Sequence, residues 1–279
     1  MTQLNSKISL LRTNIAIPQD HGSWVFILSP LLIGLFAGET FSFASIALVI
    51  AAMSGFLIRQ PVTAAVKSIS GRRPRNDIVT AGFWIFIYGL ILIASVVWMF
   101  FLNQARVIYL ALPALPIFAW HLFLVSRREE RKQAGVEIIA TGVLALSAPA
   151  AFWIGNNNFS SSGWIIWVLT WFQSAASIVY AYQRLKQKEW KTIPDIQTRI
   201  TAGHRALAYT LFNLALALFL SIKDIIPHLV WLAYLVQVIE TIWGTIHPAV
   251  GAKPVKIGVR QLFISIIYTV LFILFWRYG

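Results

Sequence analysis

Residues 56–86 read FLIRQPVTAAVKSISGRRPRNDIVTAGFWIF, and this stretch carries the pattern that decides the fold. Two apolar segments flank a gap that holds five cations: Arg59, Lys67, Arg72, Arg73 and Arg75. A helix needs roughly 17–25 apolar residues to cross a membrane core about 30 Å thick. The stretch therefore predicts two membrane helices joined by a long basic connection.

The same pattern repeats along the whole chain. Polar gaps separate nine apolar runs: residues 22–38, 41–58, 81–102, 107–125, 136–154, 163–182, 206–222, 225–246 and 257–276. Twenty of the 23 Lys and Arg residues fall at the N-terminus and in every second gap; the others are Arg106, Lys223 and Arg277. Basic loops stay cytoplasmic, so we expect the N-terminus inside and the C-terminus outside a bacterial plasma membrane. The expected fold class is all-α, a polytopic bundle of about nine transmembrane helices in one membrane domain over residues 1–279.

Composition agrees with this class. The chain is 58% hydrophobic and 12% charged, whereas a soluble domain carries about 25% charged residues. A net charge of +13 would fit a nucleic-acid partner, but topology and contacts to anionic headgroups account for the basic residues. We therefore expect membrane lipids as partners and no nucleic acid. The chain has no Cys and its His residues lack metal-ligand spacing, so no metal site is expected.

Three polar regions are candidate binding sites. The entrance of the first run contributes Asp20, His21 and Trp24. The gap after the second run, residues 59–80, contributes Arg59, Lys67, Arg72, Arg73, Asn76 and Asp77. The gap after the sixth run, residues 183–205, and the residue before it contribute Tyr182, Arg184, Lys186, His204 and Arg205. Each region has two interpretations: a helix cap or topology anchor, or a surface for phosphate, whose oxygens match the guanidinium fork.

Glu240 is the most costly acid, because it lies well inside the eighth run. A carboxylate within a membrane segment is rare and usually faces a bundle interior or a cavity. Gln237 lies one turn before it and His247 two turns after it, so the three side chains share a helix face. Glu240 is therefore a further candidate ligand-binding residue, or the proton-linked site of a transporter.

The stretch Ile17-Pro18-Gln19-Asp20-His21-Gly22-Ser23-Trp24, followed by an apolar run with Pro30 and Gly34, resembles the HG[SA]W opening of the YwiC-like family. The resemblance extends over most of the chain, although the opening is its one sharp motif. It implies a multi-pass bacterial membrane protein and no particular activity.

More distantly, the layout resembles the UbiA superfamily of membrane prenyltransferases, which implies nine helices with catalytic loops after the second and sixth. Arg73-Pro74, Arg127-Arg128 and Pro149 take part in this resemblance. The superfamily motif NDxxDxxxD would fall on residues 59–67, where Gln60, Thr63 and Lys67 replace its acids, and DxxxD would fall near residues 180–186, which contain none. In that superfamily the acids hold Mg²⁺, which neutralises a diphosphate.

The sequence thus predicts a membrane protein that binds an isoprenoid or another lipid with an anionic head in a cytoplasm-facing cavity. Arg59, Lys67, Arg184 and Lys186 would capture phosphate directly, without a cofactor. One alternative is an active transferase that uses Mg²⁺ and a rearranged acid set, Asp20, Asp77 and Asp195. The other is the proton-linked transporter in which Glu240 titrates.

Overall fold

The computed structural model describes residues 10–19, 21–129 and 133–279, and for His21 only the backbone. Every regular element in these residues is helical, which confirms the all-α expectation. The elements are α1 (Thr13–Ala16), α2 (His21–Ala37), α3 (Phe43–Ile69), α4 (Asp77–Phe101), η1 (Ala105–Ala111), α5 (Ala114–Arg127), α6 (Ala134–Ala145), α7 (Ser147–Asn156), α8 (Ser161–Gln187), α9 (Ile196–Ile222), α10 (Trp231–Ile246) and α11 (Pro254–Tyr278).

Each of the nine apolar runs coincides with a helical segment. Within the described part of the chain, seven segments are long and apolar enough to cross a membrane, with η1–α5 and α6–α7 each forming one of them. The two other segments, α2 with 17 residues and α10 with 16, are shorter. At about 1.5 Å per residue they fall short of a core about 30 Å thick. The count of nine spans therefore stays a prediction.

Three helices extend beyond the apolar runs, and this corrects the predicted loops. Helix α3 continues to Ile69 and α8 to Gln187, while α9 already begins at Ile196. Arg59, Lys67, Arg184 and Lys186 therefore lie on helices, where the sequence analysis had placed them in long gaps. The residues around them are largely Ala, Val, Leu, Gln and Lys, most of which favour a helix as soon as tertiary contacts support it.

The helices form two compact units, each with its own core. Unit 1 comprises Met1–Asp20 and Ile46–Lys132, and unit 2 comprises His21–Ser45 and Gln133–Gly279. In unit 1, Ile15 of α1 is fully buried with Ala64 of α3 and Ala81 of α4. The Tyr88 hydroxyl donates to the carbonyl of Ala16 at 3.1 Å. The expectation of a single membrane domain stays a prediction.

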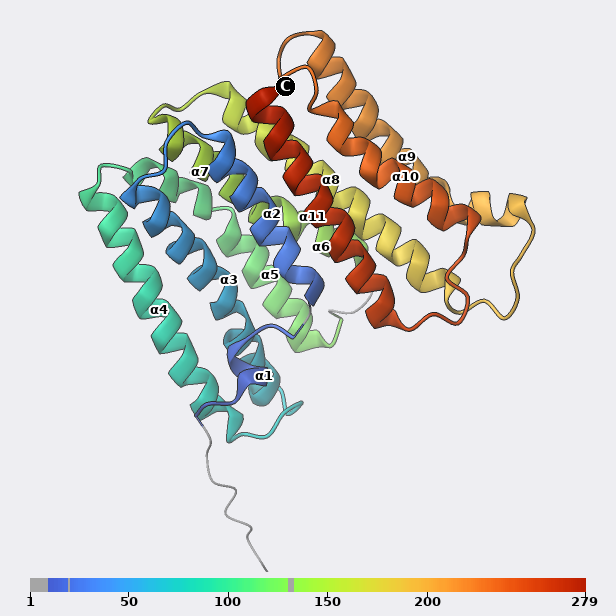
Figure 1. The fold of residues 1–279 in the computed structure, drawn as a ribbon. Helices are drawn as coiled ribbons and strands as arrows, with labels where there is room; N and C mark the ends of the chain where they lie inside the picture. Colours follow the sequence, from blue (N-terminus) through green and yellow to red (C-terminus); the bar gives the residue numbers. More distant parts are fainter. Residues whose placement is uncertain (1–9, 20, 130–132) are drawn as a thin grey trace, which may run out of the picture. The chain divides into compact units, whose positions relative to one another are not determined.

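Unit 2 is built around α8, which contacts α2, α6, α7, α9, α10 and α11. Helices α9, α10 and α11 pack in sequence beside it, and α2 lies against α11 and α7 (Figure 1). Small residues permit the closest approaches, because a Cβ at Gly34 of α2 would stand 2.1 Å from the carbonyl oxygen of Ala148 in α7. Unit 2 therefore brings α8, α10 and α11 together, and these three helices carry the polar cluster described next.

Candidate functional site

The carboxylate of Glu240 is the centre of a buried polar cluster in unit 2. Its side chain is only 3% exposed. Arg260 of α11 donates two parallel hydrogen bonds to this carboxylate, from Nε to Oε1 at 2.6 Å and from Nη2 to Oε2 at 2.7 Å. The hydroxyl of Tyr180 in α8 donates to Oε1 at 2.7 Å. Such a bidentate arginine–carboxylate pair fixes the orientation of both side chains and is stronger than a hydrogen bond between neutral groups.

Arg260 also contacts an aromatic ring, and its side chain is partly exposed. Its side chain is 43% exposed, and Cζ lies 3.7 Å from the ring centroid of Trp243 on α10. A cation over an indole face is attracted by the ring quadrupole. Three contacts thus fix this arginine, two along one edge and one with an aromatic face, while its side chain remains 43% exposed.

Arg184 joins the end of α8 to the end of α10. Its Nη1 donates to the carbonyl oxygens of Gly244 at 2.6 Å and His247 at 2.7 Å, and to Oε1 of Gln187 at 2.9 Å. The last carbonyls of a helix lack intrahelical partners and attract cations. Arg184 is buried, so these contacts assign it to helix packing and give no support to its predicted role in phosphate capture.

Close packing and amide side chains complete the cluster. A Cβ at Gly244 would stand 2.0 Å from the Tyr180 hydroxyl, so this position needs Gly for Tyr180 to reach Glu240. Gln237, which the sequence placed on the face of Glu240, donates to Thr241 at 3.2 Å. Two buried amide oxygens, Oε1 of Gln183 and of Gln261, have no hydrogen-bond partner among the described residues. A polar cluster of this kind inside an apolar bundle is a functional-site hypothesis by default.

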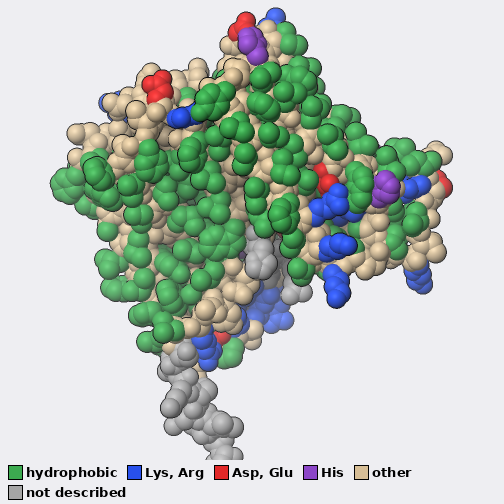
Figure 2. Space-filling view, viewed as in Figure 1, with side chains coloured by type: hydrophobic (Ala, Val, Ile, Leu, Met, Phe, Trp, Pro, Cys, Tyr) green, Lys and Arg blue, Asp and Glu red, His purple; other side chains and the backbone are tan. Residues whose placement is uncertain are grey.

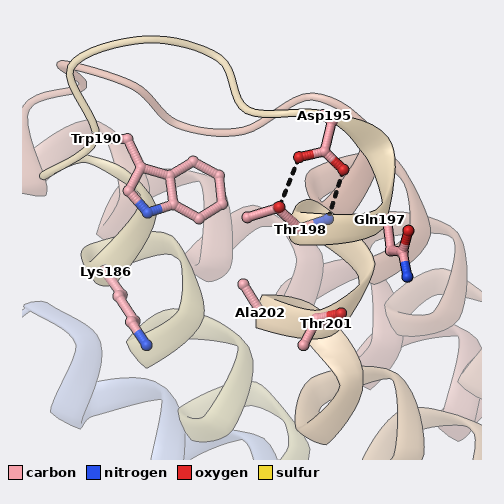
Figure 3. A pocket seen from close by; sticks show the side chains of 7 residues that line it. All are labelled: Lys186, Trp190, Asp195, Gln197, Thr198, Thr201 and Ala202. Atoms are coloured by element: carbon pink, nitrogen blue, oxygen red, sulfur yellow. Dashed lines mark hydrogen bonds between the residues drawn. The ribbon is translucent and has the colours of Figure 1, made fainter.

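A second feature of unit 2 is an open pocket of about 530 Å³ beside the α8–α9 connection. Figure 3 shows Lys186 and Trp190 on one side of it and the first turn of α9 on the other. The remaining lining residues are Asp195, Gln197, Thr198, Thr201 and Ala202. Lys186 thus lines an open pocket across from an acid, and its role in phosphate capture stays a prediction.

Asp195 caps the first turn of α9. Its two oxygens accept from the Thr198 hydroxyl at 2.6 Å and the Thr198 backbone N–H at 3.1 Å (Figure 3). Both hydrogen bonds lower the pKa of Asp195, and the bond from the Thr198 hydroxyl has the larger effect. A depressed carboxyl pKa stabilises the fold above the unfolded pKa, and this contribution is lost as the pH falls through the folded pKa.

We expect Asp195→Ala to lower the melting temperature at neutral pH, because the first turn loses its cap. The difference from the wild type should begin to shrink as the pH falls below about 4, the unfolded pKa, and this contribution is lost once the pH has fallen through the lowered pKa of the folded state. Melting curves over a pH series measure this. Gln197→Ala, an exposed neutral change in the same turn, is the control. A difference that stays constant down to the lowest pH would contradict the cap.

The candidate residues of unit 1 contact one another or nearby helices. Asp77 is buried and lies 2.7 Å from Nη1 of Arg12 and 3.9 Å from Nε of Arg73. Arg72 donates to the carbonyl oxygen of Val125 at 2.7 Å. Arg59 lies over the ring of Phe56 at 5.1 Å. The remaining two are Lys67, partly buried on α3, and Asn76, exposed before α4. A phosphate site in this unit stays a prediction.

The other candidates are dispersed. Asp20 and the side chain of His21 lie outside the described residues, and Trp24 is partly buried in the first turn of α2. Tyr182 donates to Oε1 of Glu137 at 2.8 Å. Two exposed residues belong to α9: His204, whose Nδ1 is 2.7 Å from the Thr201 carbonyl oxygen, and Arg205. Of the acids proposed for a transferase, Asp77 pairs with arginines and Asp195 caps a helix, while Asp20 lies outside the described residues, and the transferase alternative stays a prediction. No group of three metal-ligating side chains occurs among the residues that the structure describes.

Sequence reasoning missed Arg260, Tyr180 and Trp243 as members of the site. A signal for Arg260 was present, because it lies within the bounds of the ninth apolar run, 257–276, although it was counted with the basic residues of the gap before that run. A cation and an acid within neighbouring membrane segments are expected to pair. Trp243 had no comparable signal, since aromatic residues are frequent throughout this chain.

Comparison with known proteins confirms the resemblance of the opening sequence. Residues 17–152 match the family described as YwiC-like protein. The uncharacterized protein YwiC of Bacillus subtilis (strain 168) is 24% identical over 181 residues, covering 62% of this chain and 68% of the relative. No solved structure matches significantly, and the UbiA-like fold stays a prediction. Glu240 and Arg260 lie outside the residues that match the family.

Proposed function

We propose that this chain, whose residues 17–152 match the YwiC-like family, binds a lipid with an anionic head at Arg260, an oriented and partly exposed arginine in an apolar bundle. One observation carries the proposal: Glu240 and Trp243 hold the guanidinium in place while 43% of the side chain stays exposed. A ligand phosphate then meets a preorganised donor, which reduces the ordering cost of binding.

The position of Arg260 along α11 suits a headgroup. It lies six residues after Pro254, about 9 Å along the helix axis, close to where a headgroup region meets the acyl chains. Lys256 lies one turn earlier, and Lys253 directly precedes the helix. On the face drawn in Figure 2, Lys and Arg side chains gather over the end of unit 2 that carries the α8–α9 and α10–α11 connections. Clustered cations at such a boundary attract anionic lipids.

The surface beside Arg260 suits an acyl or isoprenoid chain. Ile239 and Trp243 on α10 are 64% and 39% exposed, and Phe263 and Ile267 on α11 are 61% and 46% exposed. Residues three or four apart share a helix face, so these side chains extend an apolar surface from Arg260 along both helices. The combination supports an amphiphile, an isoprenoid phosphate or a phospholipid, as the ligand class. Lys186, which lines the pocket of Figure 3, is a second cation and lies in the last turn of α8.

The test compares the wild type with the double variant Glu240→Gln/Arg260→Gln. This variant keeps the net charge of the protein, because it removes one charge of each sign, and its amides can still hydrogen-bond. A charge-assisted contact is worth roughly 1.5–3 kcal/mol, so affinity for phosphatidylglycerol in nanodiscs should fall by about tenfold or more. Native mass spectrometry of lipids retained after mild solubilisation measures the same loss.

Lys256→Gln is the control for general electrostatic attraction, because it removes a cation one turn away on the same helix. It should weaken lipid binding much less than the double variant, although it lowers the net charge. Equal losses from the two variants, or no loss from the double variant, would overturn the assignment of the headgroup to Arg260.

A further inference from the structure

We propose that the pocket between the end of α8 and the start of α9 binds a zwitterionic headgroup, in which a phosphodiester is joined to a primary ammonium group. The phosphodiester would contact Lys186, and the ammonium group would lie between Asp195 and the indole of Trp190. Arg260 is not among the lining residues, so this site is additional to the one of the proposed function. Phosphatidylethanolamine and its free headgroup, glycerophosphoethanolamine, share this chemistry.

The pocket lies at the depth where a headgroup is found. Helices α8 and α9 are both apolar enough to cross a membrane, and each has 27 residues. Such a helix is about 40 Å long, which exceeds the roughly 30 Å of the hydrocarbon core. Lys186 is the penultimate residue of α8, and Thr201 lies in the second turn of α9. The pocket is therefore lined by those ends of both helices that extend beyond the hydrocarbon core.

The size of the pocket suits a headgroup. Its volume of about 530 Å³ falls within the range of small-molecule sites, about 300–1,000 Å³. Contacts with neighbouring segments hold both of its sides in place. The backbone N–H of Gly251 donates to the carbonyl oxygen of Lys188 at 3.2 Å, and Arg199 of α9 donates to the carbonyl oxygen of Ile246. The pocket is thus formed before a ligand arrives, which reduces the ordering cost of binding.

The lining offers one charge of each sign and an aromatic ring. Figure 3 shows Lys186 and Trp190 on one side of the pocket and Asp195 on the other. The hydrogen bonds from Thr198 lower the pKa of Asp195, so its carboxylate is ionised at neutral pH. A simple anion would meet Asp195 here, and a simple cation would meet Lys186. A ligand that carries both charges matches both groups, and like-charge repulsion disfavours the simple ions.

The groups on the side of Asp195 suit a primary ammonium. This group has three N–H donors and no acceptor, whereas a carboxylate has about four acceptor positions. Thr198 occupies one position on each oxygen of Asp195, so others remain for a ligand. The side-chain amide of Gln197 also lines the pocket and adds a carbonyl oxygen. The indole face of Trp190 attracts any cation, but a quaternary ammonium has no N–H to donate to the acceptors.

Lys186 supplies the positive charge for the phosphodiester. It is exposed and lines the pocket, whereas Arg184, two residues earlier, is buried and donates to backbone carbonyls. The hydroxyl of Thr201 lines the same pocket and offers a further donor. Hydrogen bonds to an ionised group are roughly twice as strong as those between neutral groups. An ionised phosphodiester is therefore favoured over an uncharged headgroup.

Three soluble probes test the ligand class by calorimetry on the full-length protein in detergent micelles. Glycerophosphoethanolamine carries both charges. Glycerophosphoglycerol has the same phosphodiester without the ammonium group, and ethylammonium has no phosphate. An exposed charge pair changes affinity by up to about fivefold. We expect glycerophosphoethanolamine to bind about fivefold more tightly than either of the other two probes.

Two charge-removing variants, each with a matched control, test the pocket. Asp195→Asn removes the negative charge but keeps the helix cap, because Asn and Asp cap helices about equally well. It should abolish the preference for glycerophosphoethanolamine over glycerophosphoglycerol. Lys186→Gln should weaken the binding of both phosphodiesters by about fivefold. The controls Glu189→Gln and Lys191→Gln remove the same charges from exposed positions of the α8–α9 connection that do not line the pocket, and they should change neither result.

The lipid is tested with phosphatidylethanolamine as a minor component of phosphatidylcholine nanodiscs, and native mass spectrometry measures its retention. We expect the wild type to retain it and Asp195→Asn to lose most of this binding. Retention of the lipid without binding of the free probe identifies a membrane ligand, and the reverse identifies a free solute; either result supports the site. Phosphatidylglycerol and the Arg260 variant test the proposed function separately, so each proposal can fail alone.

Three results would overturn the zwitterion site. They are equal affinity of the wild type for the two phosphodiesters together with no retention of phosphatidylethanolamine, a preference that survives Asp195→Asn, and losses from the control variants as large as those from the pocket variants. If Asp195→Asn does not fold, the preference of the wild type and the comparison of Lys186→Gln with Lys191→Gln still decide.

Discussion

Replacing Arg260 alone by Gln should destabilise unit 2 more than replacing Arg260 and Glu240 together by Gln. The single change leaves a buried carboxylate with only the Tyr180 hydroxyl for compensation. Removing one partner of a fully buried pair costs about 3–5 kcal/mol. Because Arg260 is 43% exposed, solvent screens part of the interaction, and we expect a loss of roughly 2–3 kcal/mol in the free energy of unfolding. The double variant leaves two neutral amides and should recover most of this loss.

Reversible unfolding in mixed detergent micelles, followed by circular dichroism, measures both variants and the corresponding single change Glu240→Gln. The four proteins form a double-mutant cycle whose coupling energy belongs to the pair. Lys256→Gln, one turn earlier on α11, should change the free energy of unfolding by only a few tenths of a kcal/mol. If the single and double variants are equally unstable, Arg260 does not stabilise the fold by neutralising Glu240.

The sequence predicted Glu240 as a costly acid in a membrane segment, and the structure confirms that it is buried. The reasoning was local: a carboxylate in an apolar run must face something polar. It did not identify the partner, because Arg260 lies twenty positions further along the chain, on another helix. Pairing between helices depends on their packing, and hydropathy does not encode which faces meet. A search for cations inside the apolar runs would have found Arg260.

The loop predicted around Arg184 is wrong, because α8 continues through this residue and the structure buries its side chain against the last carbonyls of α10. Its role in ligand binding stays a prediction. Two causes combine here. Hydropathy ends a predicted helix at its first charged residues, but α8 continues to Gln187. Unpaired carbonyls at the end of one helix can capture a cation from a neighbouring helix, and no local pattern reveals that the two ends meet.

The basic residues of unit 2 therefore have two different roles: some are exposed cations, and others bind groups of the protein itself. Lys186 and Lys256 are exposed and suit topology or headgroup contacts. Arg184, in the last turn of α8, and Arg260, near the start of α11, have the same charge, yet both bind groups of unit 2. The planar guanidinium explains the difference, since it holds several acceptors at once and can lie flat on an aromatic ring. In this unit Arg, and not Lys, makes the contacts that organise the site.

We expect Gly34→Ala to lower the free energy of unfolding strongly, because the backbones of α2 and α7 pack closely at this residue. The new methyl group would stand 2.1 Å from the carbonyl oxygen and 2.8 Å from the Cα of Ala148. No real Cβ makes such contacts, so α2 and α7 must separate. Overpacking usually costs about 1–3 kcal/mol and occasionally more. Both sides of this contact are backbone and cannot turn away, which places the expected loss at the upper end of that range.

Gly258→Ala on α11 is the matched control, because a Cβ there meets nothing within 4 Å. Ala favours a helix over Gly by roughly 0.5–1 kcal/mol, so this change should stabilise unit 2 slightly. The two substitutions are chemically identical and should act with opposite sign in the unfolding assay used for Arg260. If Gly34→Ala were as harmless as Gly258→Ala, α2 and α7 would lie further apart than described. The loss is specific to the α2–α7 contact, and Gly34→Ala should leave the Glu240–Arg260 coupling energy unchanged, since distant sites act additively.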